Sequence, residues 1–166
     1  MSGEAATLLT DFDVRRAGTG QDRVRRISSA DGGLVHYSVR DGSIVWLASP
    51  SLPTWVPAIV DDLVRLALLG DNWDSYGARP IRSENITTAF EALLTLVRPT
   101  TPRPYVVPTV SGGVQFEWHT EGADLEIEIA APLRLEVFWE PAAGPAVELE
   151  IISDFQRLRD WIAQIS

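Results

Sequence analysis

The 166-residue chain contains no cysteine and no lysine, and it has no apolar run long enough to span a membrane. Without cysteine, neither a disulfide framework nor a thiolate zinc site can form. All fourteen basic residues are arginines. A lysine Schiff base, a P-loop lysine and a nuclease site built on two acids and a lysine are therefore excluded. A membrane-spanning helix needs about 20 consecutive apolar residues, so we expect none.

The N-terminal residues 1–10 lack the basic segment followed by an apolar segment that is typical of a secretory signal. We therefore expect a cytoplasmic protein that does not associate with membranes. Residues 1–21 are rich in glycine, alanine and threonine with weak periodicity, which predicts a flexible N-terminal arm. Residues 22–166 are about the length of one domain, and the six tryptophans of the chain favour a packed core.

Negative charge is concentrated in the last third of the chain. The formal net charge is −9. Residues 1–104 hold 12 acidic residues against 11 arginines, a balance of −1, whereas residues 105–166 hold 11 against 3, a balance of −8. Phosphate contacts need lysine or arginine, so we do not expect this part to bind nucleic acid directly. The charge instead favours a protein partner with a basic surface.

Alternation of apolar and polar residues predicts two groups of short strands separated by glycine-containing turns. The expected strands cover residues 23–29, 34–39, 43–48, 105–110, 114–118, 125–129, 133–138 and 147–151. The sequence thus predicts an α+β fold: an antiparallel meander of about five to seven strands with two or three helices packed on one face. It leaves open whether the first three strands extend that sheet or form a second one.

Helical periodicity predicts a first helix over residues 54–69, with Thr54 as its N-cap and Pro57 in its first turn. Gly70 is expected to end this helix in the left-handed conformation. A second helix should begin near Ser83 and end before Pro99, with an apolar stripe formed by Ile86, Phe90, Leu93 and Val97. A third helix should follow a cap at Ser153, with Phe155, Leu158 and Ile162 as its inward residues.

The meander would gather one set of alternate side chains on a water-facing surface rich in glutamate. This set is Gln115, Glu117, Glu126, Glu128, Glu136, Glu148 and Glu150, and Arg134 is the only basic residue among these strands. Like charges on neighbouring strands repel, at a cost of about 0.2–1 kcal/mol per pair. A basic partner would relieve this repulsion.

Three interpretations of this surface remain open. It is either a solvated face that aids solubility and protects strand edges, or a docking surface whose partner-binding residues include Glu117, Glu126, Glu128 and Glu136. Metal binding by Glu126 and Glu128 is the third interpretation, although nothing in the sequence supplies the remaining oxygen ligands of an octahedral site.

The segment Asn72–Ala78 (Asn-Trp-Asp-Ser-Tyr-Gly-Ala) lies between the first two predicted helices. We expect Trp73 and Tyr76 to be half-buried, because each combines a large apolar ring with a polar group. Asp74 can accept hydrogen bonds from the backbone of its own turn, and Gly77 can adopt a positive φ. A structural interpretation is a packed loop that Asp74 locks. The functional interpretation is a partner-binding loop formed by Trp73, Asp74 and Tyr76, with Arg79 as a further polar group.

Four segments of the chain together resemble a group of small uncharacterised bacterial proteins. These segments are Asn72–Ala78, Val107–Thr109, Gly112–His119 and Asp124–Glu128, within a region from about Leu66 to Ile129. The resemblance implies a tryptophan-aspartate-glycine loop, a helix and a Gly-Gly-led strand that ends in Glu-Trp. It also associates the chain with mobile elements or toxin–antitoxin loci. It implies no activity and identifies no catalytic residue.

Catalytic patterns are weak in this sequence. The two histidines, His36 and His119, have no nucleophile elbow or cysteine to activate, and no glycine-rich phosphate loop precedes a helix. The competing enzyme hypothesis is a small-molecule, carboxylate- or metal-dependent site made by Asp74, Glu117 and His119, and it requires these side chains to meet. No cofactor is expected.

The sequence therefore favours a non-catalytic interaction module, resembling an antitoxin, an immunity protein or an inhibitor, that docks a basic protein. The alternatives are the enzyme described above and a structural subunit that forms homo-oligomers through strand edges or exposed aromatics.

Overall fold

The computed structural model describes residues 25–28, 34–40, 43–46, 52–132, 134–151 and 155–165. The elements in these ranges are β1 (Arg25–Ser28), β2 (Leu34–Arg40), β3 (Ser43–Trp46), α1 (Val56–Ala67), α2 (Ser83–Leu96), β4 (Tyr105–Pro108), β5 (Val114–His119), β6 (Ala123–Ala131), β7 (Arg134–Pro141), β8 (Val147–Ile151) and α3 (Phe155–Ile162). The predicted arm at residues 1–21 and the predicted cap Ser153 lie outside the described residues. None of the described helices is long and apolar enough to cross a membrane.

The strands form two separate antiparallel sheets. One has the order β1-β2-β3 and the other the order β4-β5-β6-β7-β8. Each strand of the larger sheet pairs with the next in the chain, so this sheet is the predicted meander. The sequence left open whether the first three strands extend this sheet or form a second one. They form a second sheet.

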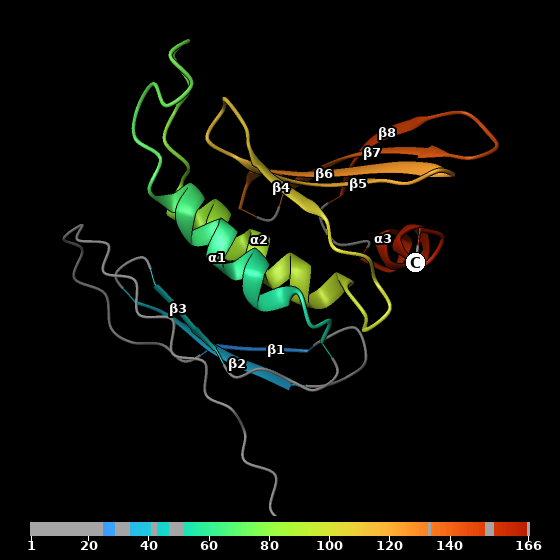
Figure 1. The fold of residues 1–166 in the computed structure, drawn as a ribbon, viewed down its shortest axis with the longest axis horizontal. Helices are drawn as coiled ribbons and strands as arrows, with labels where there is room; N and C mark the ends of the chain where they lie inside the picture. The colour runs from blue at the N-terminus through green and yellow to red at the C-terminus, as the bar shows by residue number, and fades with distance from the viewer. Residues whose placement is uncertain are drawn as a thin grey trace, which may run out of the picture.

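The helices lie on one face of the larger sheet (Figure 1), as predicted. Helix α2 contacts β5 and β6 on that sheet and β1 of the smaller sheet, while α1 contacts β4 and β3. The two sheets therefore enclose a helical layer, and α3 packs beside α2 beneath the C-terminal strands. The opposite face of the larger sheet carries no helix among the described residues.

The core lies between the larger sheet and the helices. Its strand residues alternate along β5, β6 and β7 and are Val114, Phe116, Trp118, Leu125, Ile127, Ile129, Leu135, Val137 and Trp139. The predicted stripe of α2 is buried against them. Trp139 stacks on Trp161 of α3 with ring centroids 5.6 Å apart. Burial of each large apolar side chain stabilises the fold by about 1.5–3 kcal/mol, which fixes the polar side of these three strands toward water.

Two predicted details of α1 are wrong. Thr54 is not the cap, because Trp55 precedes the first helical residue and no side chain caps the helix. Gly70 does not take a positive φ. The helix instead ends in two short turns, in which the amides of Leu68 and Leu69 bond to carbonyls three residues earlier. Pro57 lies in the first turn, as predicted.

Candidate functional site

The outer face of the larger sheet carries eight carboxylates, which we call the acidic face. They are Glu117, Asp124, Glu126, Glu128, Glu136, Glu140, Glu148 and Glu150. The strand register sets several of these groups directly opposite one another. The facing pairs are Glu117 with Glu126, Asp124 with Glu140, Glu128 with Glu136, and Glu136 with Glu150. Among the described residues of these strands, the basic side chains on this face are Arg134 and His119. The glutamates predicted to share one surface therefore do so.

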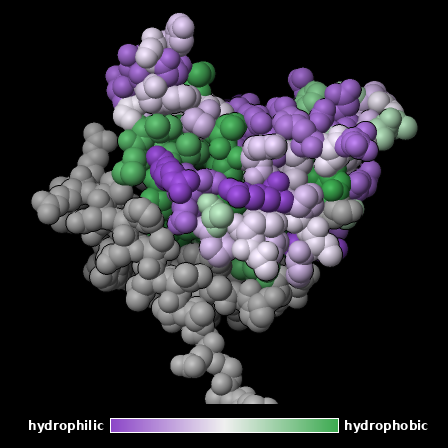
Figure 2. Space-filling model, viewed as in Figure 1, coloured by the Kyte–Doolittle hydropathy of each residue, from purple (hydrophilic) through white to green (hydrophobic). Residues whose placement is uncertain are grey.

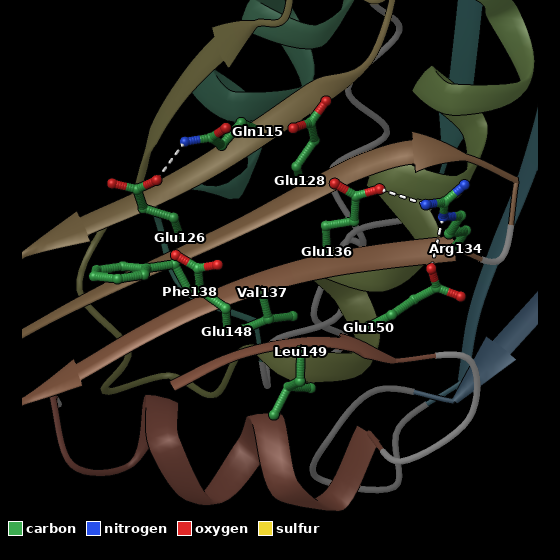
Figure 3. A pocket seen from close by; sticks show the side chains of 10 residues that line it. All are labelled: Gln115, Glu126, Glu128, Arg134, Glu136, Val137, Phe138, Glu148, Leu149 and Glu150. Atoms are coloured by element: carbon green, nitrogen blue, oxygen red, sulfur yellow. Dashed lines mark hydrogen bonds and ion pairs between the residues drawn. The ribbon is translucent and has the colours of Figure 1, made fainter. Parts of the chain in front are cut away.

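A shallow hollow of about 470 Å³ lies over β6, β7 and β8 on this face (Figure 3). Five carboxylates line it, those of Glu126, Glu128, Glu136, Glu148 and Glu150. The partly exposed ring of Phe138 lies among them, since Phe138 faces Glu126 on one side and Glu148 on the other. An aromatic ring surrounded by carboxylates provides both a charged and a flat apolar contact.

Arg134 offsets the charge at one end of the hollow. Its Nη2 lies 2.9 Å from Oε1 of Glu136, and its Nε lies 2.8 Å from Oε2 of Glu150. Arg134 is the one arginine lining the hollow, so five carboxylates and one guanidinium leave four net negative charges there. All three side chains are about half-exposed. Water therefore screens these ion pairs, and each contributes little to stability.

Gln115 and His119 of β5 contact carboxylates of β5 and β6. The amide Nε2 of Gln115 donates to Glu117 at 3.1 Å and to Glu126 at 2.9 Å, so one neutral group bridges two facing carboxylates. His119 lies 3.0 Å from Asp124 through Nδ1 and 3.3 Å from Glu117 through Nε2. These hydrogen bonds, first that to Asp124 and then that to Glu117, raise the pKa of His119. A protonated imidazole can donate to both carboxylates at once.

Asp74 locks the loop between α1 and α2. Its Oδ1 accepts hydrogen bonds from the backbone amides of Tyr76 at 2.8 Å and Ala78 at 3.0 Å. These bonds, led by that from Ala78, lower the pKa of Asp74. The side chain of Asn72 accepts a third backbone bond, from Gly77 at 2.7 Å. The carboxylate of Asp74 thus performs the structural role that its sequence position suggested.

The two aromatics of this loop behave differently. Trp73 is half-buried and donates from Nε1 to the carbonyl of Arg79 at 3.0 Å. Tyr76, which we expected to be half-buried, is 94% exposed. Its backbone is held by Asp74, whereas its ring lies outside the loop and no part of the described chain covers it. The loop therefore displays a tyrosine rather than enclosing it.

The base of the loop is attached to the turn between β4 and β5. The amide of Arg79 donates to the carbonyl of Val110 at 3.0 Å, and that of Arg82 donates to Gly112 at 3.2 Å. The buried amide of Asn85 adds a bond to the same Gly112 carbonyl at 2.9 Å. The loop consequently projects from the end of the sheet at which β5 begins (Figure 1). Hydrophilic side chains dominate the surface of this projection and the surface over the larger sheet (Figure 2).

The proposed enzyme residues do not form one site. Glu117 and His119 meet, but Asp74 belongs to the loop at the opposite end of β5. The six residues of that strand span about 17 Å, at about 3.4 Å per residue. The carboxylate that joins His119 is Asp124, which the sequence analysis missed. The turn after His119 is short, so the register of the hairpin places Asp124 opposite His119. This register could have been counted from the sequence.

Within the described parts of the chain, no group of three or more histidine, aspartate or glutamate side chains is arranged to hold a metal ion. Glu128, one of the two residues considered as metal ligands, accepts a hydrogen bond from the hydroxyl of Ser111 at 3.2 Å. Glu126 accepts from Gln115. The polar contacts of these two side chains are thus with neutral donors of the protein itself.

The fold and the site together define an α+β protein whose meander presents an acidic face beside a projecting aromatic loop. A scan against protein-family models found no match, and searches of curated proteins and of solved structures found none either.

Proposed function

We propose that this protein is a non-catalytic interaction module whose acidic face docks a basic surface of a protein partner. The observation that carries the proposal is the register of the sheet, which sets carboxylate against carboxylate in four cross-strand pairs. Arg134 bridges the pair Glu136 and Glu150, and the amide of Gln115 bridges the pair Glu117 and Glu126. A facing pair of like charges without such a bridge costs about 0.2–1 kcal/mol, and the fold retains it. Cations from a partner would relieve the repulsion and would be attracted over about 10 Å at moderate salt.

The hollow favours arginine over lysine as the main contact of the partner. A guanidinium can bond two ways to a carboxylate and can stack on an aromatic ring, whereas an ammonium is a more strongly hydrated point charge. Phe138 supplies such a ring between Glu126 and Glu148. An arginine-rich surface, such as one that otherwise contacts nucleic-acid phosphates, has the matching chemistry. By covering that basic surface, the module would act in the manner of an antitoxin, an immunity protein or an inhibitor.

The loop between α1 and α2 supplies a second contact in this proposal. Tyrosine is enriched among residues that dominate binding energy, because its ring adds a large contact area with few rotatable bonds. Tyr76 is presented on a loop whose backbone is already fixed by Asp74 and Asn72, so binding would cost little further ordering. Trp73 and Asp74, grouped with Tyr76 in the sequence analysis, support the loop in this proposal rather than contact the partner.

A charge-neutralising variant tests the acidic face. We would replace Glu126, Glu128 and Glu136 with glutamine and capture partners from extracts of the native host at stepped salt concentrations. The matched control replaces Asp61, Glu84 and Asp160 with their amides, because these acids are partly or fully exposed and lie on the helices, away from both the outer face of the sheet and the loop between α1 and α2. Both variants lose three negative charges, so only the position of the charge differs.

The acidic-face variant is expected to lose its partner at lower salt than the wild type, with an affinity about 3- to 150-fold weaker. This range follows from about 0.2–1 kcal/mol for each of three exposed charge contacts. The control variant should retain the partner. Recovery of the same partner by both variants with the same salt dependence would refute the proposal. Light scattering at two concentrations separates it from the homo-oligomeric alternative, which predicts a mass that rises with concentration.

A further inference from the structure

Strand β8 is an edge strand of the larger sheet. It is the last strand in the order β4-β5-β6-β7-β8, and no described segment pairs with its outer side. The edge of a sheet presents unpaired backbone N–H and C=O groups that can accept another strand. Val147–Ile151 contains no proline, so every residue of this strand keeps its N–H.

The opposite edge, β4, is protected in two ways. It ends in Pro108, which has no N–H, and Pro104 directly precedes it. Helix α1 also contacts this strand, and Arg103 beside it forms an ion pair with Asp62 of α1 at 2.9 Å. The protection is therefore asymmetric. Strand addition is disfavoured at β4, whereas at β8 no proline opposes it and no described strand occupies the edge.

The two sides of β8 have different chemistry. Glu148 and Glu150 are exposed on the acidic face. Val147 and Leu149 lie on the core side, opposite Trp139 and Val137, and remain partly exposed because no further strand covers them. Figure 3 shows Leu149 directed away from the carboxylates, on the side of α3. A strand added here would meet alternating acidic and apolar neighbours.

We infer that β8 is the docking edge for an extended segment of the partner in which basic and apolar residues alternate. The segment pairs with β8 as a sixth strand. Its basic side chains lie beside Glu148 and Glu150 and extend the acidic face, and its apolar side chains cover Val147 and Leu149. Backbone hydrogen bonds give such a complex its affinity and alternate side chains give it specificity. This inference rests on the proposed function and adds the form of the partner to it.

The charge pattern argues against a second copy of this chain as the occupant. Two β8 strands paired with each other would bring Glu148 and Glu150 of one copy next to the same residues of the other. Like charges across a strand pair are destabilising. Arg134 already bonds to Glu136 and Glu150. The same glutamates that disfavour self-association therefore select a basic strand.

Three synthetic eight-residue peptides test this inference on the full chain. The first alternates arginine and valine, the second has the same composition with the arginines in one block, and the third alternates threonine and valine. Two further versions of the first peptide carry backbone N-methyl groups, either on every arginine or on every valine. Affinity is measured by fluorescence anisotropy, and hydrogen exchange monitors the amides of residues 147–151.

We expect the alternating arginine peptide to bind at least about tenfold more tightly than the block peptide and to slow exchange in β8, where a factor of ten corresponds to about 1.4 kcal/mol. A paired strand uses the N–H groups of every second residue. One N-methylated version should therefore lose at least about tenfold in affinity, and the other should bind within about threefold of the parent peptide.

Equal binding of the alternating and block peptides, or indifference to both methylation patterns, overturns the strand-pairing inference. If the arginine peptides bind the wild type in this way but do not bind the variant in which Glu126, Glu128 and Glu136 are glutamine, the proposed function survives. Absence of binding by the alternating peptide, with a partner still captured through the acidic face, also overturns strand pairing alone. If the threonine peptide binds as tightly as the arginine peptide and slows exchange in β8 equally, strand pairing stands, but the basic occupant inferred here and the electrostatic docking of the proposed function both fail.

Discussion

The Nδ1 atom of His119 lies 3.0 Å from the carboxylate of Asp124, its direct neighbour across the pair formed by β5 and β6. This contact is the main cause of the raised pKa of His119, with Glu117 as the second. We predict that Asp124→Asn moves the pKa of His119 back toward its ordinary value of 6.5, because the amide keeps an acceptor and loses the charge. A titration followed by NMR measures it. Asp160→Asn, on α3, is the control, and an unchanged pKa in Asp124→Asn would contradict the assignment.

The raised pKa of His119 also links stability to pH. The folded state binds the proton more tightly than the unfolded state, so the stabilising contribution is complete below about pH 6.5 and disappears as pH rises through the folded-state pKa. His119→Gln should therefore cost more stability at about pH 5.5 than at about pH 8.5. Urea denaturation of both proteins at both pH values measures the difference. A cost that is equal at the two values, or larger at the higher one, would show that the imidazole gains nothing from its carboxylates.

Two glycines with open surroundings separate backbone strain from steric clash. Gly77 has φ 97°, whereas Gly70 lies outside the left-handed region, and neither has an atom within 4 Å of the position that an added methyl group would occupy. A left-handed conformation costs a non-glycine residue about 1–2 kcal/mol. We predict that Gly77→Ala destabilises the protein, while Gly70→Ala is neutral or stabilises it by up to about 1 kcal/mol. Urea denaturation compares them, and equal effects would refute the assigned loop geometry.

Asn85 joins α2 to the turn between β4 and β5. Its buried Nδ2 donates to the carbonyls of Gly112 at 2.9 Å and Ala130 at 3.4 Å. Asn85→Ala should reduce the free energy of unfolding by about 1–3 kcal/mol, because these carbonyls lose a buried donor. Asn85→Asp should cost more at neutral pH, since it buries a charge, and part of that cost should vanish as the pH falls and the carboxyl group regains a donor.

The control for Asn85 is Thr87→Ala on the same helix. The hydroxyl of Thr87 bonds only to the carbonyl of Ser83 one turn earlier, so its removal should change stability by less than about 0.5 kcal/mol. A small effect of both Asn85 variants would mean that the junction between loop, helix and sheet does not depend on this amide.

The sequence predicts most of the larger sheet well because β5, β6 and β7 each have one buried and one wet side. Alternation at Val114, Phe116 and Trp118 is sufficient to fix both the strand and its orientation, and the same holds for the following strands. The limits of α1 were harder to predict. Thr54 has the chemistry of a cap and Gly70 that of a helix end, but the helix begins after Trp55, whose Nε1 bonds to the distant carbonyl of Thr101, a contact that local sequence does not reveal.

In the candidate site, too, some features follow from the sequence pattern and others depend on the tertiary structure. Membership of the acidic face follows from the period of the strands, so the sequence identified Glu117, Glu126, Glu128 and Glu136 together. The partners of individual groups depend on register, which adds Asp124 to His119 and sets Phe138 among the glutamates. Local patterns do not carry this information. The exposure of Tyr76 could not be predicted from the sequence either. Tyrosine rings are usually at least partly buried, and whether other segments cover this loop depends on the tertiary structure.

Arg134 offers the sharpest electrostatic test, because it partly neutralises the face that is proposed to bind cations. Arg134→Gln removes the ion pairs with Glu136 and Glu150 and leaves the acidic face more negative by one charge. We predict that the affinity for a basic partner rises about two- to fivefold at low salt, which corresponds to about 0.4–1 kcal/mol. Stability should fall by no more than about 1 kcal/mol, since these groups are half-exposed.

The matched control for this substitution is Arg103→Gln. It removes an arginine that pairs with Asp62 on the α1 side of β4, so it changes net charge equally without altering the acidic face. If the two variants bind the partner equally tightly, the gain comes from net charge alone. If Arg134→Gln binds no better than the wild type, the carboxylates around Phe138 do not contact the partner. Only a gain specific to Arg134 agrees with docking in the hollow, because only there does the lost guanidinium compete with a cation of the partner for the same two carboxylates.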